Sequence, residues 1–465
     1  METLHYLLVS EKIIQDRKPE FRRLLGILFV SLLLCVLQGF FLTALAAGPR
    51  ILTLDEALAI AAEQNHDIQK AREYRNQVTG RYVEERAAAL PHLTLNSSAL
   101  WENDNSISKD IIYPSRIDRR SAYVELSQVL FSWGQVSAAI DAAREGLKTA
   151  DDQLRLYRQA VFKDVSVAYY NSLLARELLD LARQNLDQKS RHLDEAKRKY
   201  AAGVATDYDV LAAEVAVANA RPDVIRANND IRTTRDQLRF LLGIEEEIDV
   251  VGSLEATILN PPTYDEALDV ATRYRPELSD LRHRQYVYDQ LVKIARAGDK
   301  PRLDLKAGYG YRQTDMSGTS GDGTIWNTGI HLSWPFFDGL KTRGKVSQAE
   351  SDLATSRIEE QKLVDSISLE ARRAINAVNE SEEIVLALSG TVSQAERLLK
   401  MAEKGYELGV KISLEVDDAQ LNRVQAKLNL ARAKREYLSA WVHLKWVMGV
   451  LGEGNGATGG TGSTP

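Results

Sequence analysis

Apolar and polar positions alternate in several short segments of the chain. In the clearest of them, 302–312, every odd position is apolar or aromatic and every even position is polar or glycine. A period of two predicts a β-strand with one apolar and one polar face. Weaker alternation at 93–101, 124–130 and 326–334 predicts three more strands. The strands pair in two expected β-hairpins, 93–130 and 302–336.

Two much longer segments follow the hairpins, and both lack proline and are rich in residues that favour helices. About 66 residues at 1.5 Å each make a helix of roughly 100 Å. Leu154, Val161 and Val165 recur at heptad-like spacing, which is typical of coiled coils. A further helix is expected before each hairpin, ending at Pro91 or Pro301. The long helices are expected at 137–202 and 342–408, and shorter ones at 206–242 and 412–449. Pro222 should kink the helix at 206–242.

The whole pattern occurs twice. The Asp-Glu-Ala-Leu of 55–58 returns at 265–268, a shift of 210 residues (265 minus 55), and the Tyr-x-x-Gly of 200–203 returns at 406–409, a shift of 206 (409 minus 203). A nearly constant shift across half a chain indicates tandem duplication. Each half contains a helix, two strands, a long helix, a turn and a shorter helix. The structural repeats are expected at 47–255 and 256–450.

Both ends of the chain differ in composition from the repeats. Residues 24–47 are apolar, follow a basic stretch and end in a small-x-small pattern. This is typical of a secretory signal peptide, expected at 1–46; the alternative is a retained membrane anchor. The only cysteine, Cys35, lies in this segment, so the processed chain would have no disulfide or thiolate chemistry. The Gly- and Thr-rich tail 451–465 is expected to be disordered.

The predicted strands suit a lipid bilayer. A length of about 9–11 residues matches a tilted bilayer-spanning strand, and aromatic residues lie near the strand ends. The alternative is a sheet that covers a soluble core. Four strands cannot close a barrel and lipid does not tolerate an open sheet edge, so several chains would share one barrel. The hairpin loops are expected at 103–120 and 313–324, the second with an exposed turn at 321–323.

Composition and motifs argue against several functional classes. The formal net charge of −6 provides no basic face of the kind that binds nucleic acid. The seven histidines lack the spacing of metal ligands, and no nucleotide or cofactor motif is present. No carboxylate pairs recognisably with a nucleophile. The chain is therefore expected to be no enzyme and to need no cofactor.

The order of several short motifs resembles the outer membrane efflux protein family, the TolC-like exit ducts of Gram-negative bacteria. The motifs are Asp-Glu-Ala-Leu and Tyr-x-x-Gly in both halves, Leu-Pro-x-Leu-x-Leu before the first hairpin, Arg-Pro-Glu-Leu at 275–278, and aromatic-Gly segments at 129–134 and 335–339. The resemblance implies a mainly α fold with a small β part, in a homotrimer with a twelve-stranded barrel in the outer membrane and a twelve-helix tunnel in the periplasm.

The resemblance also implies partners and a mechanism. Cargo would leave passively, delivered by an inner-membrane pump of RND, ABC or MFS type through a periplasmic adaptor. The site residues it implies are the periplasmic aperture carboxylates Glu415 and Asp418, the closed-state latch Asp209, Tyr406 and Lys411, and the adaptor-docking tips Gly203 and Gly409.

Copies of each aperture carboxylate around a common axis would repel one another, select cations and bind divalent metals. The alternative for this region is an acidic helix start, in which Glu415, Asp417 and Asp418 interact favourably with the helix dipole alone.

A periplasmic coiled-coil scaffold or pump adaptor is the alternative function. Such a protein would have a helical hairpin flanked by compact β-domains and a single copy of each element. The duplicated short strands fit a duct better. A wide polar lumen discriminates little, so the sequence predicts no particular cargo.

Overall fold

The computed structural model describes residues 49–103, 116–255, 258–316 and 319–452. The expected signal peptide 1–46, the centre of loop 103–120 and most of the tail 451–465 lie outside the described residues. The chain divides into a smaller unit, Met1–Ile51 with Glu246–Asp249, and a larger unit, Leu52–Glu245 with Val250–Pro465.

The smaller unit is described only at 49–51 and 246–249. The Arg50 N–H donates to the Glu247 carbonyl at 2.9 Å, and its guanidinium lies 3.9 Å from the Glu246 carboxylate. Arg50 begins strand β1 (Arg50–Leu52), which pairs with β4 (Ile248–Val250) in a two-stranded sheet.

The helices of the larger unit occur in the same order in both halves. The first half has α3 (Leu54–Gln64), α4 (His66–Ala87), α5 (Gln135–Ala201) and α6 (Asp207–Leu242). The second half has α7 (Tyr264–Tyr274), α8 (Pro276–Arg296), α9 (Lys341–Glu407) and α10 (Ser413–Val447). The long and the shorter helices lie within two residues of their expected bounds.

The opening helix of each half differs from the expectation, because it consists of two helices. The backbone is extended at Asn65 (ψ 131°) and at Arg275 (ψ 122°). The Asn65 side chain accepts from the Asp67 N–H at 2.8 Å and so caps the next helix. Arg275 precedes Pro276, and a residue before proline avoids the helical region. The second helix of each pair also ends earlier than expected, at Ala87 and Arg296 rather than at Pro91 and Pro301.

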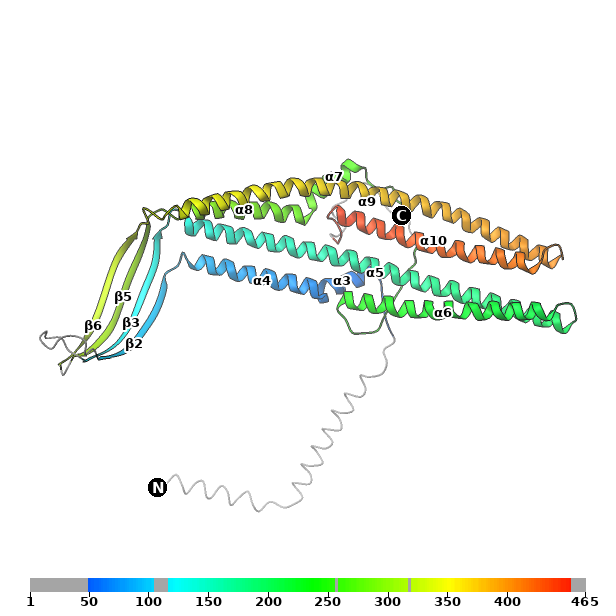
Figure 1. Ribbon diagram of the computed structural model, residues 1–465, viewed down its shortest axis with the longest axis horizontal. Coiled ribbons are helices and arrows are strands. Elements are labelled where there is room, and N and C mark those ends of the chain that lie inside the picture. The colour runs from blue at the N-terminus through cyan, green and yellow to red at the C-terminus, as the bar shows by residue number, and fades with distance from the viewer. Residues whose placement is uncertain (1–48, 104–115, 256–257, 317–318, 453–465) are drawn as a thin grey trace, which may run out of the picture. The chain divides into compact units, whose positions relative to one another are not determined.

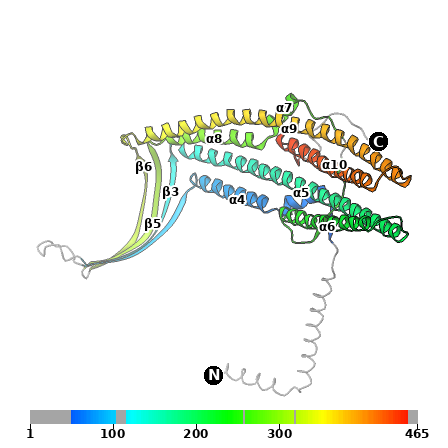
Figure 2. The ribbon, with the colours of Figure 1, turned by 45° about the vertical axis from the view of Figure 1, so that its right-hand side comes forward.

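Helix α5 is the centre of a layer of helices. It contacts α4, α6, α8 and α10, and α4, α5, α8 and α9 lie side by side in both ribbon views (Figures 1 and 2). Of the residues expected in its apolar seam, Val161 and Val165 are buried, and Leu154 is partly buried. With 67 residues, α5 is about 100 Å long. Helix α6 continues through Pro222, which lies inside it.

Each shorter helix ends against the break in the opening helix of its own half. Gly243 follows α6 with φ +71°, and the Asn65 side-chain amide donates to the Leu241 carbonyl at 2.7 Å. Gly449 follows α10 with φ +74° and packs on the backbone of Arg275. Each shorter helix therefore ends where the two opening helices of its own half meet.

Replacing Gly243 with alanine should destabilise the protein by about 2–4 kcal/mol, because a Cβ adds left-handed strain and a clash. That Cβ would lie 2.4 Å from the Gln64 carbonyl oxygen. Gly203→Ala is the matched control, since it has φ +75° but no heavy atom within 4 Å of the added Cβ. Its cost should be about 1 kcal/mol. Urea unfolding followed by circular dichroism measures both, and equal losses would contradict the role of the junction.

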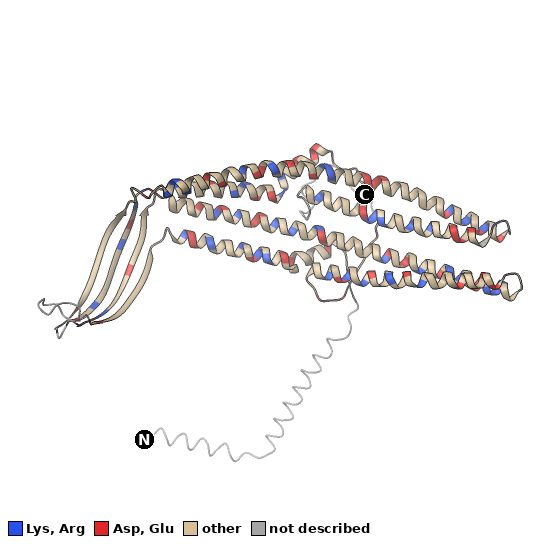
Figure 3. Ribbon diagram, in the orientation of Figure 1, with Lys and Arg blue, Asp and Glu red and all other residues tan. Residues whose placement is uncertain are grey.

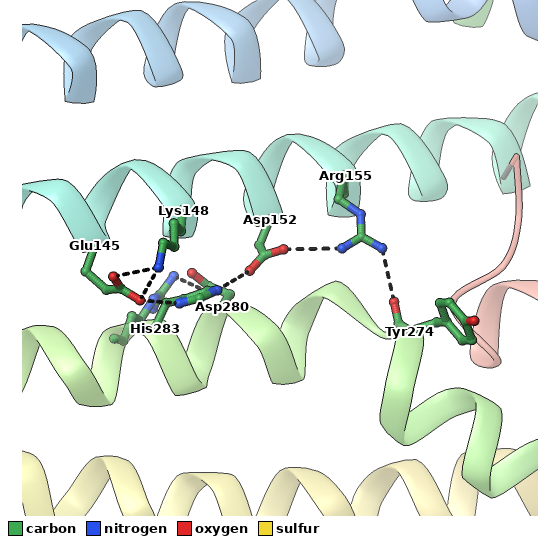
Figure 4. Close-up of polar contacts among 8 residues, drawn as sticks. Glu145, Lys148, Asp152, Arg155, Tyr274, Asp280 and His283 are labelled. Atoms are coloured by element: carbon green, nitrogen blue, oxygen red, sulfur yellow. Dashed lines mark hydrogen bonds and ion pairs between the residues drawn. The ribbon is translucent and has the colours of Figure 1, made fainter.

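A polar cluster joins α5 of the first half to α8 of the second (Figure 4). His283 Nδ1 lies 2.6 Å from Glu145 Oε1, and its Nε2 lies 3.7 Å from Asp152 Oδ2. Asp280 pairs with Arg284 at 2.7 Å. Burial raises the pKa of the Asp280 carboxyl, against the opposing effect of Arg284. The two halves are therefore held together by charged groups as well as by apolar packing.

The four-stranded sheet is antiparallel throughout, in the order β2–β3–β5–β6. Leu95, Val124, Tyr309 and Trp326 are direct neighbours across all four strands. Since side chains of directly paired residues share a face, one face of the sheet is apolar. The strands are β2 (His92–Asn103), β3 (Arg116–Phe131), β5 (Arg302–Met316) and β6 (Thr319–Ser333).

The strands are longer than expected, with 12 to 16 residues each. The expected loop 313–324 is wrong, because pairing between β5 and β6 continues to Met316 and Thr319. The expected turn at 321–323 is likewise part of β6. In the first hairpin, residues 116–120 are strand rather than loop.

The apolar face is exposed to its surroundings. Leu93, Leu95, Tyr309, Trp326 and Ile330 are each more than half exposed. Strands β2 and β6 are the edges of the sheet, and each pairs with one strand of the described chain. Among the described helices, none is long and apolar enough to cross a membrane.

The sheet and the helical turns lie at opposite ends of the larger unit (Figure 1). Helix α5 starts soon after β3 and ends at Ala201, about 100 Å away. Helix α9 likewise runs from the second hairpin to its own turn after Glu407. The two turns are therefore the far tips of two helical hairpins, α5–α6 and α9–α10.

Candidate functional site

The two tips are built by the same backbone motif. At the first tip, Gly203 has φ +75°, its N–H donates to the Tyr200 carbonyl at 2.9 Å, and the Val204 N–H donates to Lys199 at 3.0 Å. The second tip repeats this at Gly409 (φ +73°), where the Val410 N–H donates to Gly405 at 2.9 Å. This double bond around a left-handed glycine is a Schellman motif, which ends a helix and reverses the chain.

Asp209 caps the start of α6. Its carboxylate accepts from the Thr206 N–H at 2.8 Å and from the Thr206 hydroxyl at 2.7 Å. In return, the Asp209 N–H donates to the Thr206 hydroxyl at 3.3 Å. These bonds, first of all that from the Thr206 N–H, hold the pKa of Asp209 below its ordinary value. Asp209 therefore completes a capping box.

Glu415 has the matching position at the start of α10. Its carboxylate forms an ion pair with Lys411 and accepts from the Ile412 N–H at 3.1 Å. Lys411 and then Ile412 lower the pKa of Glu415 from its ordinary 4.5. The stability that this carboxylate contributes is present above pH 4.5 and is lost as the pH falls through the lowered pKa of the folded state. Asp418, one turn further on, is exposed.

Tyr406 links the two hairpins within one chain. Its hydroxyl accepts from Lys199 Nζ at 3.1 Å, and the same ammonium lies 4.3 Å from the centre of its ring. Lys199 Nζ also forms an ion pair with Glu195 Oε1 at 2.8 Å. Glu195 and then Tyr406 raise the pKa of Lys199. The last turn of α5 is thereby tied to the last turn of α9.

The expected latch residues do not meet in this arrangement. Among the described residues, no hydrogen bond or ion pair joins Asp209 to Tyr406, and Lys411 pairs with Glu415 instead. Asp209 and Glu415 instead share one role as capping carboxylates, as the alternative of an acidic helix start anticipates for Glu415. The expected aperture residues Glu415 and Asp418 lie together at the start of α10.

A polar cleft of about 830 Å³ separates the two hairpins. Its walls carry charges of both signs, including Arg191 and Glu195 of α5, Glu396 and Lys400 of α9, and Arg423 of α10. Acidic and basic residues are interspersed along these helices (Figure 3). No group of three potential metal ligands occurs among the described residues.

Apolar side chains stand out at both tips. Val204 and Tyr208 of the first tip are 74% and 77% exposed, and Val410 and Ile412 of the second are 77% and 63% exposed. Val204 and Val410 have equivalent positions in the two halves, and exposed apolar groups that lie together are typical of a surface that contacts a partner.

Comparison with known proteins agrees with this architecture. The sequence profile of the outer membrane efflux protein family matches residues 57–244 and again 267–450. The chain belongs to the outer membrane efflux protein family. Membership places it in the outer membrane of a Gram-negative bacterium.

Individual members of the family are distant in sequence. The alkaline protease secretion protein AprF of Pseudomonas aeruginosa is 28% identical over 444 residues, covering 93% of this chain and 90% of AprF. Outer membrane protein TolC of Escherichia coli is 23% identical over 433 residues, covering 90% and 87%. The CmeC outer membrane channel of Campylobacter jejuni superposes with a TM-score of 0.75 at 17% identity, covering 85% of each chain. The last comparison shows a common fold.

Sequence reasoning missed Lys199 and Glu195. Their spacing of four residues in the last turns of α5 indicates an ion pair within the helix, and a lysine there suits the helix dipole. Nothing in the sequence indicates that Lys199 reaches the second hairpin, because its partner Tyr406 lies 207 residues away.

Proposed function

We propose that three copies of this chain form a duct through which cargo leaves passively across the periplasm and the outer membrane. The observation that supports this best is the sheet, which has an exposed apolar face and two open edges at one end of a layer of helices about 100 Å long. In lipid the edges must pair, so edge β2 of one copy would pair with edge β6 of the next.

Three copies give a closed barrel of twelve strands, from four strands in each chain. The polar face of the sheet, with Thr94, Asn96 and Lys306, would then line water. The helices continue each sheet as a tunnel. Cargo is driven by a pump in the inner membrane, and the duct itself performs no catalysis and needs no cofactor.

The tips are the docking surface for a periplasmic adaptor. Val204 and Val410 are exposed at equivalent positions beside Gly203 and Gly409. Adaptor copies can therefore bind both tips through the same kind of contact. The names of the relatives include secretion and channel proteins, which supports a partner that delivers cargo.

The starts of α6 and α10 form the aperture. Glu415 and Asp418 of three copies would make two rings of carboxylates, with Glu415 partly neutralised by Lys411. The Lys199–Tyr406 link holds the hairpins of one chain together. The Asp209 carboxylate is exposed at the tip. It would contact Tyr406 or Lys411 of a neighbouring copy and so form the second part of the latch.

The proposal is tested with the purified full-length protein. We expect detergent to be needed for its release from membranes, a native mass of three copies and steady conductance in planar lipid bilayers. Recovery as a soluble periplasmic monomer would favour the scaffold or adaptor alternative. A trimer without conductance in bilayers would exclude the duct.

A further inference from the structure

A groove of about 410 Å³ lies on the helix layer, close to the sheet. Its floor is a stripe of small residues on α5, which includes Ala139, Ala142 and Gly146. Helix α4 provides one wall and helix α8 the other, and α5 lies between them in Figures 1 and 2. Because these floor residues are small, side chains of α5 do not fill the space between the two walls.

Apart from the charged Arg81, Glu85 and Arg284, the walls are aromatic and aliphatic. Tyr74 and Val78 of α4 face the groove from one side, and Tyr288 and Leu291 of α8 from the other. The volume lies within the range of pockets that bind small molecules, about 300–1,000 Å³. In the proposed trimer, neighbouring copies join the layer at its edge helices, α4 and α9, and so leave this face uncovered.

One polar atom in the groove has no partner. Thr149 lines the groove and is only 8% exposed, and its Oγ1 makes no hydrogen bond within the described residues. A threonine in a helix usually donates to the carbonyl four residues earlier. A buried hydroxyl without a partner costs about 1–3 kcal/mol, so a ligand that bonds to it removes that cost.

These features select one class of ligand. An alkyl chain from a lipid would fill the groove but leave the Thr149 hydroxyl unpaired. Water would satisfy the hydroxyl but leave Tyr74, Tyr288 and Leu291 wetted. An aromatic molecule with one polar group on its ring system satisfies both, because rings pack against the tyrosine walls.

We propose that this groove binds small aromatic amphiphiles, with the ring system between Tyr74 and Tyr288 and a polar group bonded to Thr149 Oγ1. The inference rests on the proposed duct in one respect, namely that such molecules are regarded as its cargo. Binding is measured without any conductance, so the two proposals fail separately.

N-phenyl-1-naphthylamine is a suitable probe, since it is aromatic, carries one N–H and fluoresces strongly in apolar surroundings. It is titrated into the full-length protein in lipid nanodiscs, with empty nanodiscs as the background. We expect saturable binding above that background. Thr149→Val keeps the shape but removes the hydroxyl, and should weaken binding about 2- to 10-fold.

A second variant blocks the groove. A Cβ at Gly146 would have only Val78 Cγ1 near it, at 3.8 Å, so Gly146→Leu is tolerated and its side chain occupies the floor. We expect it to abolish the saturable signal. Gly80→Leu on α4 is the matched control, because nothing lies within 4 Å of its Cβ and Gly80 is not part of the groove.

Each outcome decides something. No saturable binding, or equal binding by wild type and Gly146→Leu, overturns the site. Loss in Gly146→Leu with unchanged binding in Thr149→Val overturns the ligand class, because the polar group then has no role. Conductance of the same preparation in planar bilayers tests the duct independently of these results.

Discussion

Replacing Lys199 with methionine is expected to raise the occupancy of the conducting state about fivefold. The substitution removes both the hydrogen bond to Tyr406 and the cation–π contact that tie α5 to α9. Each is worth about 0.5–1 kcal/mol at a partly exposed site, and a shift of about 1 kcal/mol changes a two-state ratio about fivefold. Single-channel recording in planar bilayers measures the occupancy.

The chain offers a matched control for this variant. Lys197 is two residues away and pairs with Glu214 at 3.1 Å within the first hairpin. Lys197→Met removes the same charge but no link between the hairpins, so it should leave the occupancy unchanged. Tyr406→Phe keeps the ring and loses the hydroxyl, and should have an intermediate effect. Equal currents in all four proteins would show that Lys199 and Tyr406 do not hold the closed state.

The same recordings test the second part of the latch. Asp209→Asn keeps an oxygen that accepts from Thr206 and so keeps the cap on α6. A larger current in Asp209→Asn would therefore reflect a contact with another copy rather than unravelling of the helix start. Unchanged current would limit Asp209 to its capping role.

Much of the helical architecture follows from local sequence. The long helices form because helix-favouring residues continue without a break, and they end before Gly203 and Gly409. The shorter helices end before Gly243 and Gly449, and all four glycines have left-handed conformations. The breaks at Asn65 and before Pro276 carry local signals too, an Asx cap and a residue before proline.

The sheet was harder to predict at its far end. Composition at 313–324, rich in Gly, Ser, Thr and Asp, is typical of a loop. It is strand because β5 and β6 stay in register from Arg302 opposite Ser333 to Met316 opposite Thr319. Register is a property of the pair of strands, and neither strand alone reveals it.

Contacts between the tips depend on tertiary geometry in the same way. Asp209 and Glu415 have equivalent positions in the two halves, which draws attention to them in the sequence. In the structure, both carboxylates cap the start of a helix. The repeat does not point to Lys199, because the equivalent residue in the second half is Gly405, which has no side chain. The contact between Lys199 and Tyr406 therefore could not be predicted from the repeat.

Glu415 and Asp418, the proposed aperture carboxylates, are expected to differ in their effect on divalent cations. Glu415 is engaged by Lys411 and by the Ile412 N–H, whereas Asp418 is exposed and its charge is available to ions. Asp418→Asn should therefore raise the half-blocking concentration of Mg²⁺ about tenfold or more, since an ion on the axis of the proposed trimer loses attraction from several copies at about 1 kcal/mol each. Glu415→Gln should raise it less, and the double variant Glu415→Ala with Asp418→Ala should relieve block most.

The neighbouring Asp417 is the control for this experiment, because it is also exposed but lies about 100° around α10 from Asp418. Asp417→Asn should leave the block unchanged if only one face of α10 borders the aperture. Block is read from single-channel current in planar bilayers as divalent cation is added to the side of the tips. If Asp417→Asn and Asp418→Asn relieve the block equally, a general negative potential around the start of α10 accounts for it. If no variant relieves it, the narrowest point of the duct lies away from α10, since a ring of carboxylates that ions must pass cannot lose its charge without changing the affinity for a divalent cation.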